Sequence, residues 1–127
     1  MRAVDTNIIV RLVTRDDAAQ VLAAEAYIAK GGAWVSHLVL VEVAWVLASV
    51  YELGRAPIAT AMEMLLEQEH LRVQEPSIAA AAVRLYRKGG GRDFADCLIL
   101  EVARGAGHLP LGTFDRSLAK VDGVERV

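Results

Sequence analysis

Short apolar segments alternate with longer helical patterns along this chain, and this alternation limits the fold more than any other feature. The expected strands cover residues 2–5, 33–36, 71–73 and 109–113, and the tail 123–127 is expected to add an edge strand. Strands separated by helices pair in parallel, because a right-handed crossover returns the chain to the same side of the sheet. The sequence therefore predicts an α/β fold with a central parallel sheet.

Start and stop signals delimit the helices between these strands. Asp16 and Asp17 are suited to cap the second helix, because acidic side chains favour the positive end of a helix. Pro57 is expected to open another helix, and the run Gly89–Gly91 is expected to end one. The expected helices cover residues 8–13, 17–29, 38–53, 57–69, 76–88, 93–104 and 116–119.

Composition favours one well-buried domain over residues 1–127. Hydrophobic residues make up 54% of the chain, which excludes a disordered protein. The net charge of −2 gives no overall basic signature, so a nucleic acid would have to bind through a local patch or a metal ion. The single cysteine, Cys97, lies in an apolar run and is expected to pack in the core. With no signal sequence and no apolar run of about 20 residues, we expect a cytoplasmic protein without a membrane span.

One carboxylate interrupts the longest apolar run. Glu42 is the only charged residue between Leu38 and Ala48. A helix that is apolar on all sides is expected to be buried, and a buried carboxylate costs several kcal/mol unless it is paired or binds a metal. No basic residue lies one helical turn away, although a distant arginine could still pair with Glu42.

Four further acidic residues lie near expected strand or helix ends. Asp5 follows the first strand and Asp115 follows the fourth, while Asp93 and Asp96 share one face at the start of a helix. Each has a local explanation, since Asp5 could form a turn with Asn7 and the others could cap helices. Parallel strands end at one edge of a sheet, however, so these side chains and Glu42 can also converge there.

Converging carboxylates repel one another, and a divalent cation with a preference for oxygen ligands removes that penalty. The three histidines, His37, His70 and His108, are scattered, so a zinc site is not expected. An acidic pocket with Mg²⁺ or Mn²⁺ suits phosphoryl chemistry, because the metal neutralises the phosphate and activates water. Short polar side chains expected around this pocket are Thr6, Asn7, Ser36 and Thr113.

Four segments in this order resemble a PIN-domain nuclease, in particular the VapC toxins of toxin–antitoxin pairs. They are Val4-Asp5-Thr6-Asn7, the Val-Leu-Val-Glu-Val run ending at Val43, the segment 93–99, and Thr113-Phe114-Asp115-Arg116. The resemblance spans essentially the whole chain. It implies a three-layer α/β/α sandwich, a Mg²⁺- or Mn²⁺-dependent endoribonuclease, a homodimer, and a small VapB-type antitoxin that blocks the site.

The resemblance also assigns roles to individual residues. Asp5, Glu42 and Asp96 match the metal-binding acids, Asp115 matches a more variable fourth acid, and Asp93 matches an accessory acid. The hydroxyls of Thr6 and Thr113 match groups that line the site.

Basic residues beside these motifs are candidates for RNA contacts. Arg92 and Arg116 flank the acids and could bind the RNA backbone. Arg84, Arg87 and Lys88 could widen that patch or could form an ordinary solvated helix face.

A groove for the antitoxin is a further expectation. The helix after Pro57 is broadly apolar, and with the helix of Trp45 it could hold an antitoxin segment through Met62 and Leu66. Ordinary core packing of these side chains is the alternative.

Two other functions remain open from the residues. A phosphoacceptor receiver domain also has an acidic metal pocket, but it needs a lysine at a late strand end, and residues 111–113 contain none. A PIN-like fold kept only for binding is the second alternative, and the intact acids argue against it.

Overall fold

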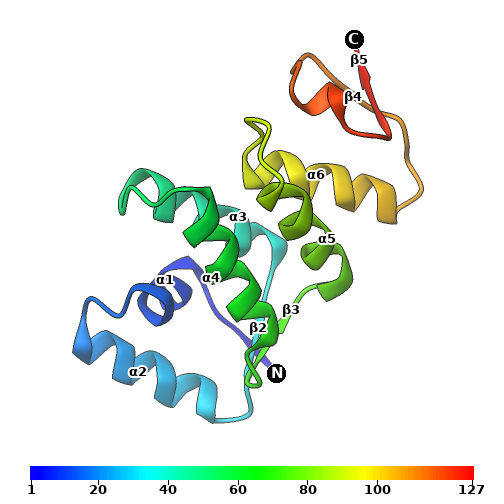
Figure 1. Ribbon diagram of the computed structural model, residues 1–127. Coiled ribbons are helices and arrows are strands. Elements are labelled where there is room, and N and C mark those ends of the chain that lie inside the picture. The colour runs from blue at the N-terminus through cyan, green and yellow to red at the C-terminus, as the bar shows by residue number, and fades with distance from the viewer.

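The structure is a computed structural model that describes residues 1–127 (Figure 1). It confirms the expected order of strands and helices. The elements are β1 (Arg2–Ala3), α1 (Thr6–Thr14), α2 (Ala18–Ala29), β2 (Ala33–Val35), α3 (His37–Ser49), α4 (Arg55–Glu67), β3 (Leu71–Val73), α5 (Pro76–Arg87), α6 (Phe94–Gly105), β4 (Leu111–Thr113), the 3₁₀ turn η1 (Leu118–Lys120) and β5 (Val124–Arg126).

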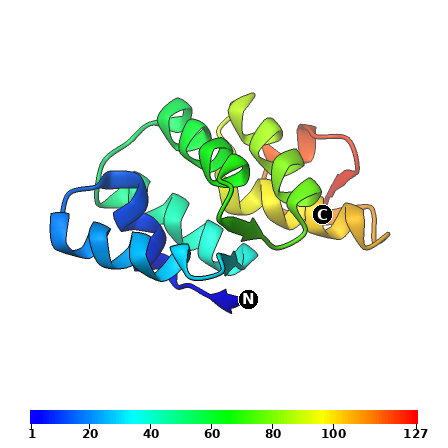
Figure 2. The same ribbon diagram turned by 90° about the horizontal axis from the view of Figure 1, so that it is seen from below.

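All strand pairs are parallel, which confirms the α/β class and is consistent with a three-layer α/β/α fold. β2 lies between β1 and β3, with Ala33 opposite both Arg2 and Leu71. Helix α1 packs against α2 and α3, whereas α4 and α5 pack against β3. Helices and parallel strands thus alternate along the chain as the sequence pattern predicts, and Figure 2 shows β1 at the lower edge of the molecule, near the N-terminus.

The parallel strands belong to two sheets. β4 pairs only with β5, with Leu111 opposite Val124, and neither strand joins β1. Figure 1 shows this C-terminal unit beyond α6, away from the three-stranded sheet. A hydrogen bond joins this C-terminal unit to α6. Arg104 Nη2 donates to the carbonyl of Asp122 at 2.8 Å.

The core forms where apolar faces of α1, α3, α4, α5 and α6 meet the sheet. Ile9, Leu47, Ile58 and Phe94 are all fully buried in one continuous cluster. Cys97 is buried as expected, and burial raises the pKa of its thiol to about 11. A thiol with such a pKa stays protonated at neutral pH, so Cys97 is a packing residue and not a nucleophile.

Several element boundaries differ from the expected ones for identifiable backbone reasons. Helix α3 ends at Ser49 and not at residue 53, because Glu52 adopts a left-handed φ of 55°. Helix α4 begins two residues before Pro57, with Gly54 at its cap. Strand β4 begins only at Leu111, after a proline that has no N–H to donate to a ladder.

A polar cluster joins the end of α1 to the segment after α3. Tyr51 Oη accepts from Arg11 Nη1 at 2.9 Å and donates to Asp16 Oδ2 at 2.7 Å, while Thr14 Oγ1 donates to Asp16 Oδ1 at 2.8 Å. The hydrogen bond from Tyr51 is the main cause that lowers the pKa of Asp16. This cluster is therefore expected to contribute less to the stability of the fold when Asp16 is protonated.

Replacing Tyr51 by phenylalanine should lower the urea midpoint of unfolding at neutral pH. The loss should shrink as the pH falls below 3.8, the ordinary pKa of Asp16, because the folded-state advantage of the carboxylate disappears on protonation. The measurement is urea unfolding of both proteins across pH. Tyr27→Phe is the matched control, since Tyr27 offers its ring to Arg2, with no recorded bond to its hydroxyl. An equal loss at every pH would contradict the role of Asp16.

No helix of the protein combines the length and the apolar character needed to cross a membrane.

Candidate active site

Asp5 lies where the sequence places it, directly after β1 and Val4. Its Oδ1 accepts a hydrogen bond from the amide of Ile8 at 3.3 Å, so Asp5 is the N-cap of α1. This cap, and not a turn with Asn7, is its local role. The side chain is exposed and its second oxygen has no recorded partner. Asp5 is thus free to bind a ligand at the end of the strand.

Asp93 and Asp96 form the start of α6. Asp93 Oδ1 accepts from the amide of Asp96 at 2.8 Å, which confirms Asp93 as a helix cap. Asp96 is half-buried in the first helical turn. The pKa of Asp96 is raised, first by burial and then by the charges of Asp93 and Asp115. The negative charges of Asp93 and Asp115 thus disfavour ionisation of Asp96.

Asp115 is held by the turn that follows β4. Its Oδ1 accepts from the Ser117 amide at 2.7 Å, from the Ser117 hydroxyl at 2.8 Å and from the Leu118 amide at 3.3 Å. These hydrogen bonds lower the pKa of Asp115, with the bond from the Ser117 hydroxyl the largest cause. Asp115 is therefore kept ionised next to Asp96, which resists ionisation.

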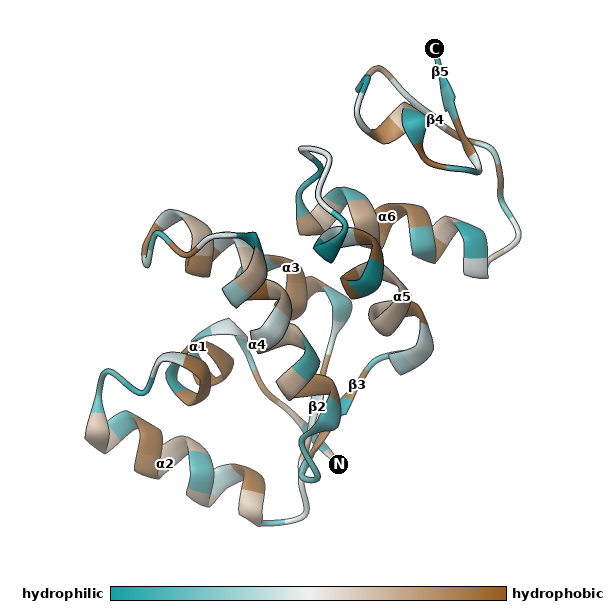
Figure 3. Ribbon diagram, viewed as in Figure 1, coloured by the Kyte–Doolittle hydropathy of each residue, from teal (hydrophilic) through white to brown (hydrophobic).

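Glu42 is exposed, so the expectation that it is buried is wrong. It shares the outer face of α3 with Leu38, which is 77% exposed, and Trp45, which is 67% exposed. Figure 3 shows hydrophobic residues along this helix. Helix α3 carries apolar residues on all sides, but only one of its faces is buried in the core. Its outer apolar face is exposed.

Carboxylate oxygens are suitable ligands for a hard cation, but the arrangement of these acids in the structure does not form a metal site. Only oxygen donors are present, which suits Mg²⁺ or Mn²⁺. No three carboxylate, histidine or cysteine side chains lie close enough together to hold an ion.

The short polar side chains near the acids mostly serve local structure. Ser36 caps α3 by accepting from the Val39 amide at 3.2 Å. Thr113 Oγ1 accepts from the amide of Asp115 at 3.0 Å, and so helps to orient that turn. Thr6 is half-buried at the start of α1, and Asn7 is exposed beside it.

The arginines near the acids differ from expectation. Arg92 is only 9% exposed and bonds to Ser117, so it does not offer a surface to RNA. Arg116 is exposed, with no recorded hydrogen bond or ion pair, and it follows Asp115 directly. Arg87 pairs with Glu63 at 2.9 Å, which leaves Arg84 and Lys88 as ordinary exposed charges on and just after α5.

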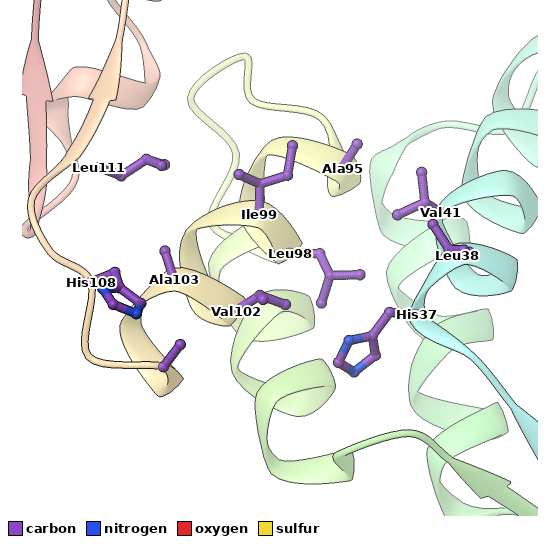
Figure 4. Close-up of a pocket in the computed structure, with 11 residues that line it drawn as sticks. His37, Leu38, Val41, Ala95, Leu98, Ile99, Val102, Ala103, His108 and Leu111 are labelled. Carbon is purple, nitrogen blue, oxygen red and sulfur yellow. The ribbon is translucent and has the colours of Figure 1, made fainter.

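An apolar groove holds none of the acids (Figure 4). It has a volume of about 460 Å³ and is lined from α3, α6 and β4, by residues that include Leu38, Leu98, Val102 and Leu111. This groove was not predicted from the sequence. The available signal was the number of apolar residues in α6, which exceeds what a single buried helix face requires. His37 lines the groove and has a partner, because its Nε2 lies 2.7 Å from the carbonyl of Gln74.

The expected groove between α4 and α3 is not present at Met62. Met62 is 1% exposed and belongs to the core together with Ile58 and Leu65. The broadly apolar character of α4 is thus explained by ordinary core packing.

Comparison with protein families identifies the domain that carries these acids. A sequence profile of the PIN domain matches residues 2–124. The chain belongs to the PIN domain family. PIN domains are generally nucleases and typically use divalent metal ions. No curated protein and no solved structure gives a significant match to the chain. The matched region includes Asp5, Asp93, Asp96 and Asp115.

Proposed function

We propose that this PIN domain protein is a metal-dependent endoribonuclease that hydrolyses RNA phosphodiester bonds. One observation supports the proposal above the others. Asp96 is half-buried, and its pKa is raised by burial and by the negative charges of Asp93 and Asp115. Residues whose pKa values are perturbed by burial and nearby charges concentrate at functional sites.

We propose separate roles for the acidic residues in metal binding. Asp96, Asp93 and Asp115 would hold Mg²⁺ or Mn²⁺, with Asp5 contributing its free oxygen from the end of β1. A divalent ion bound there would neutralise the phosphate and activate water. Asp115 is pre-oriented by three hydrogen bonds and stays ionised, so it needs no rearrangement to act as a ligand. Glu42 could contribute only from the exposed face of α3.

The first experiment is cleavage of a mixed RNA pool by the purified protein. We expect cleavage with Mg²⁺ or Mn²⁺ and none with EDTA. Restored cleavage on adding metal back to the chelated protein would separate metal loss from denaturation. Cleavage that persists in EDTA would contradict metal dependence.

A binding-only PIN module is the second candidate, because no three acids gather around one point in the structure. It predicts RNA binding in gel shifts without cleavage at any metal concentration. The same RNA pool distinguishes the two functions, since the nuclease yields fragments and the binding module yields only shifted, intact RNA.

Arg116 is the proposed contact to the RNA backbone. It is exposed beside Asp115 and carries no recorded ion pair. Replacing Arg116 by glutamine should weaken RNA binding and reduce the slope of log K against log salt by about 1, because one phosphate contact is lost. Fluorescence anisotropy over a salt series measures this slope. Arg84→Gln on α5 is the matched control, and equal slopes for Arg116→Gln and wild type would contradict the contact.

The VapC resemblance supports further proposals about partners. We propose a role as the toxin of a toxin–antitoxin pair, with a small VapB-type antitoxin and a homodimer in solution. The uncovered apolar face of α3, with Leu38 and Trp45, offers a surface that association would bury. Light scattering of the purified protein tests the dimer, and a mass of one chain would contradict it.

A further inference from the structure

Arg92 is a buried arginine whose position the proposed chemistry does not explain. It is 9% exposed, and its Nη1 donates to the carbonyl of Ser117 at 3.1 Å. Its Nε is buried with no hydrogen-bond partner. Burying a charged guanidinium group costs free energy, so its burial here indicates a structural role for Arg92.

The loop before α6 is shaped to accept this guanidinium. Gly90 has a φ of 82°, a region that other residues rarely adopt. A Cβ added to Gly90 would lie 2.7 Å from Arg92 Nη1 and 3.0 Å from its Cζ. The guanidinium therefore packs directly on the backbone of Gly90, and a side chain at residue 90 would displace it.

The backbone of Arg92 is fixed from the other side by Arg55. Arg55 Nη1 donates to the carbonyl of Arg92 at 2.6 Å and to the carbonyl of Tyr86 at 2.9 Å. The Arg55 guanidinium also stacks 4.5 Å from the centre of the Tyr86 ring. Tyr86 in turn meets Phe94 edge-on, with ring centres 5.8 Å apart. The residue that precedes Asp93 is thus held at both its side chain and its backbone.

These contacts link the two acidic segments through one residue. The Arg92 side chain holds the carbonyl of Ser117, whose amide and hydroxyl donate to Asp115. Arg92 directly precedes Asp93, whose carboxylate binds the amide of Asp96. A movement of Arg92 would change the position of Asp115 relative to Asp96.

We propose that Arg92 is a positioning residue that fixes Asp115 relative to Asp93 and Asp96. The inference rests on the proposed nuclease function for its effect on cleavage. The only acid that the side chain of Arg92 is linked to by hydrogen bonds is Asp115, through Ser117. It sets the geometry of the acids from the buried side and does not itself contact RNA.

Kinetics of Arg92→Met and Arg92→Lys test the proposal. We expect Arg92→Met to lower kcat on the order of 10²-fold, since misplacing a reacting group by about 1 Å costs that much. KM for RNA should stay near the wild-type value, because the exposed Arg116 is unchanged. Arg92→Lys keeps the charge and should recover part of kcat. Gly90→Ala should lower kcat in the same way while Arg92 itself is present.

Arg104→Met is the matched control. It removes the hydrogen bond from Arg104 to the Asp122 carbonyl, which also joins α6 to the C-terminal unit, and Arg104 has no hydrogen bond to the acids at the start of α6 or to Asp115. It should leave kcat unchanged. If Arg92→Met lowers kcat no more than Arg104→Met does, the proposal is overturned. A kcat loss that only tracks the fraction of unfolded protein, measured by circular dichroism, also overturns it.

Hydrogen exchange separates this inference from the proposed function. The amides of Ser117 and Leu118 donate to Asp115, so they should exchange faster in Arg92→Met than in wild type, while amides of α2 keep their rates. If the wild-type protein cleaves no RNA, the proposed function fails, and exchange still decides whether Arg92 positions Asp115. Unchanged exchange at Ser117 and Leu118 overturns the positioning role.

Discussion

Replacing Asp96 by asparagine is expected to lower RNA cleavage on the order of 10²-fold or more, the effect of removing a group that acts on the reacting centre. Asparagine has the same shape but lacks the negative charge and one acceptor oxygen. Asp96 is the carboxylate that the charges of both Asp93 and Asp115 affect, so its loss breaks the acidic group. Initial rates on the RNA that wild type cleaves measure the effect.

The same variant should be at least as stable as wild type at neutral pH. The pKa of Asp96 is raised above its ordinary value of 3.8, first by burial, so the ionised carboxylate destabilises the fold. This penalty is absent below 3.8, grows as the pH rises from 3.8 towards the folded-state pKa, and is constant above it. Asp96→Asn and wild type should therefore unfold together at about pH 3, with the variant the more stable at about pH 7.

Asp122→Asn is the matched control, because Asp122 is an exposed acid whose side chain has no recorded bond. It should keep both cleavage and the wild-type dependence of stability on pH. Full cleavage by folded Asp96→Asn would exclude Asp96 from the site. Reduced stability of the variant at neutral pH would contradict the sign of the pKa shift.

Replacing Phe94 by alanine is expected to cost about 3–5 kcal/mol of unfolding free energy, as phenylalanine truncations in cores do. Phe94 is 2% exposed, and its ring meets Tyr86 edge-on between α5 and α6. Removing it leaves a cavity beside Asp93 and takes away the aromatic contact. Urea unfolding measures the change through the midpoint at constant slope.

The chain contains a matched control for this substitution. Phe114, the only other phenylalanine, is 82% exposed, so Phe114→Ala should change stability by no more than about 0.5 kcal/mol. Similar losses for both variants would contradict the packing of α6 against α5. Because Phe114 precedes Asp115, its variant also tests whether the exposed ring has a role in RNA binding.

Local signals in the sequence determined much of the fold. Capping by Asp17 and Asp93 and the alternation of apolar strands with helices depend on contacts within a few residues, and each is found as expected. The parallel pairing of β1, β2 and β3 follows from the helical crossovers between them. The tail strand is also present, as the partner of β4.

The sequence by itself thus determined the family, the order of the elements and the caps at Asp17 and Asp93, because these depend on residue types close together in the chain. Only the tertiary structure decided the burial of side chains. Glu42 is exposed and Arg92 is buried, the reverse of what charge and hydropathy along the chain indicate. Burial depends on which face a distant element covers: nothing covers the outer face of α3, whereas Gly90 and Ser117 enclose Arg92.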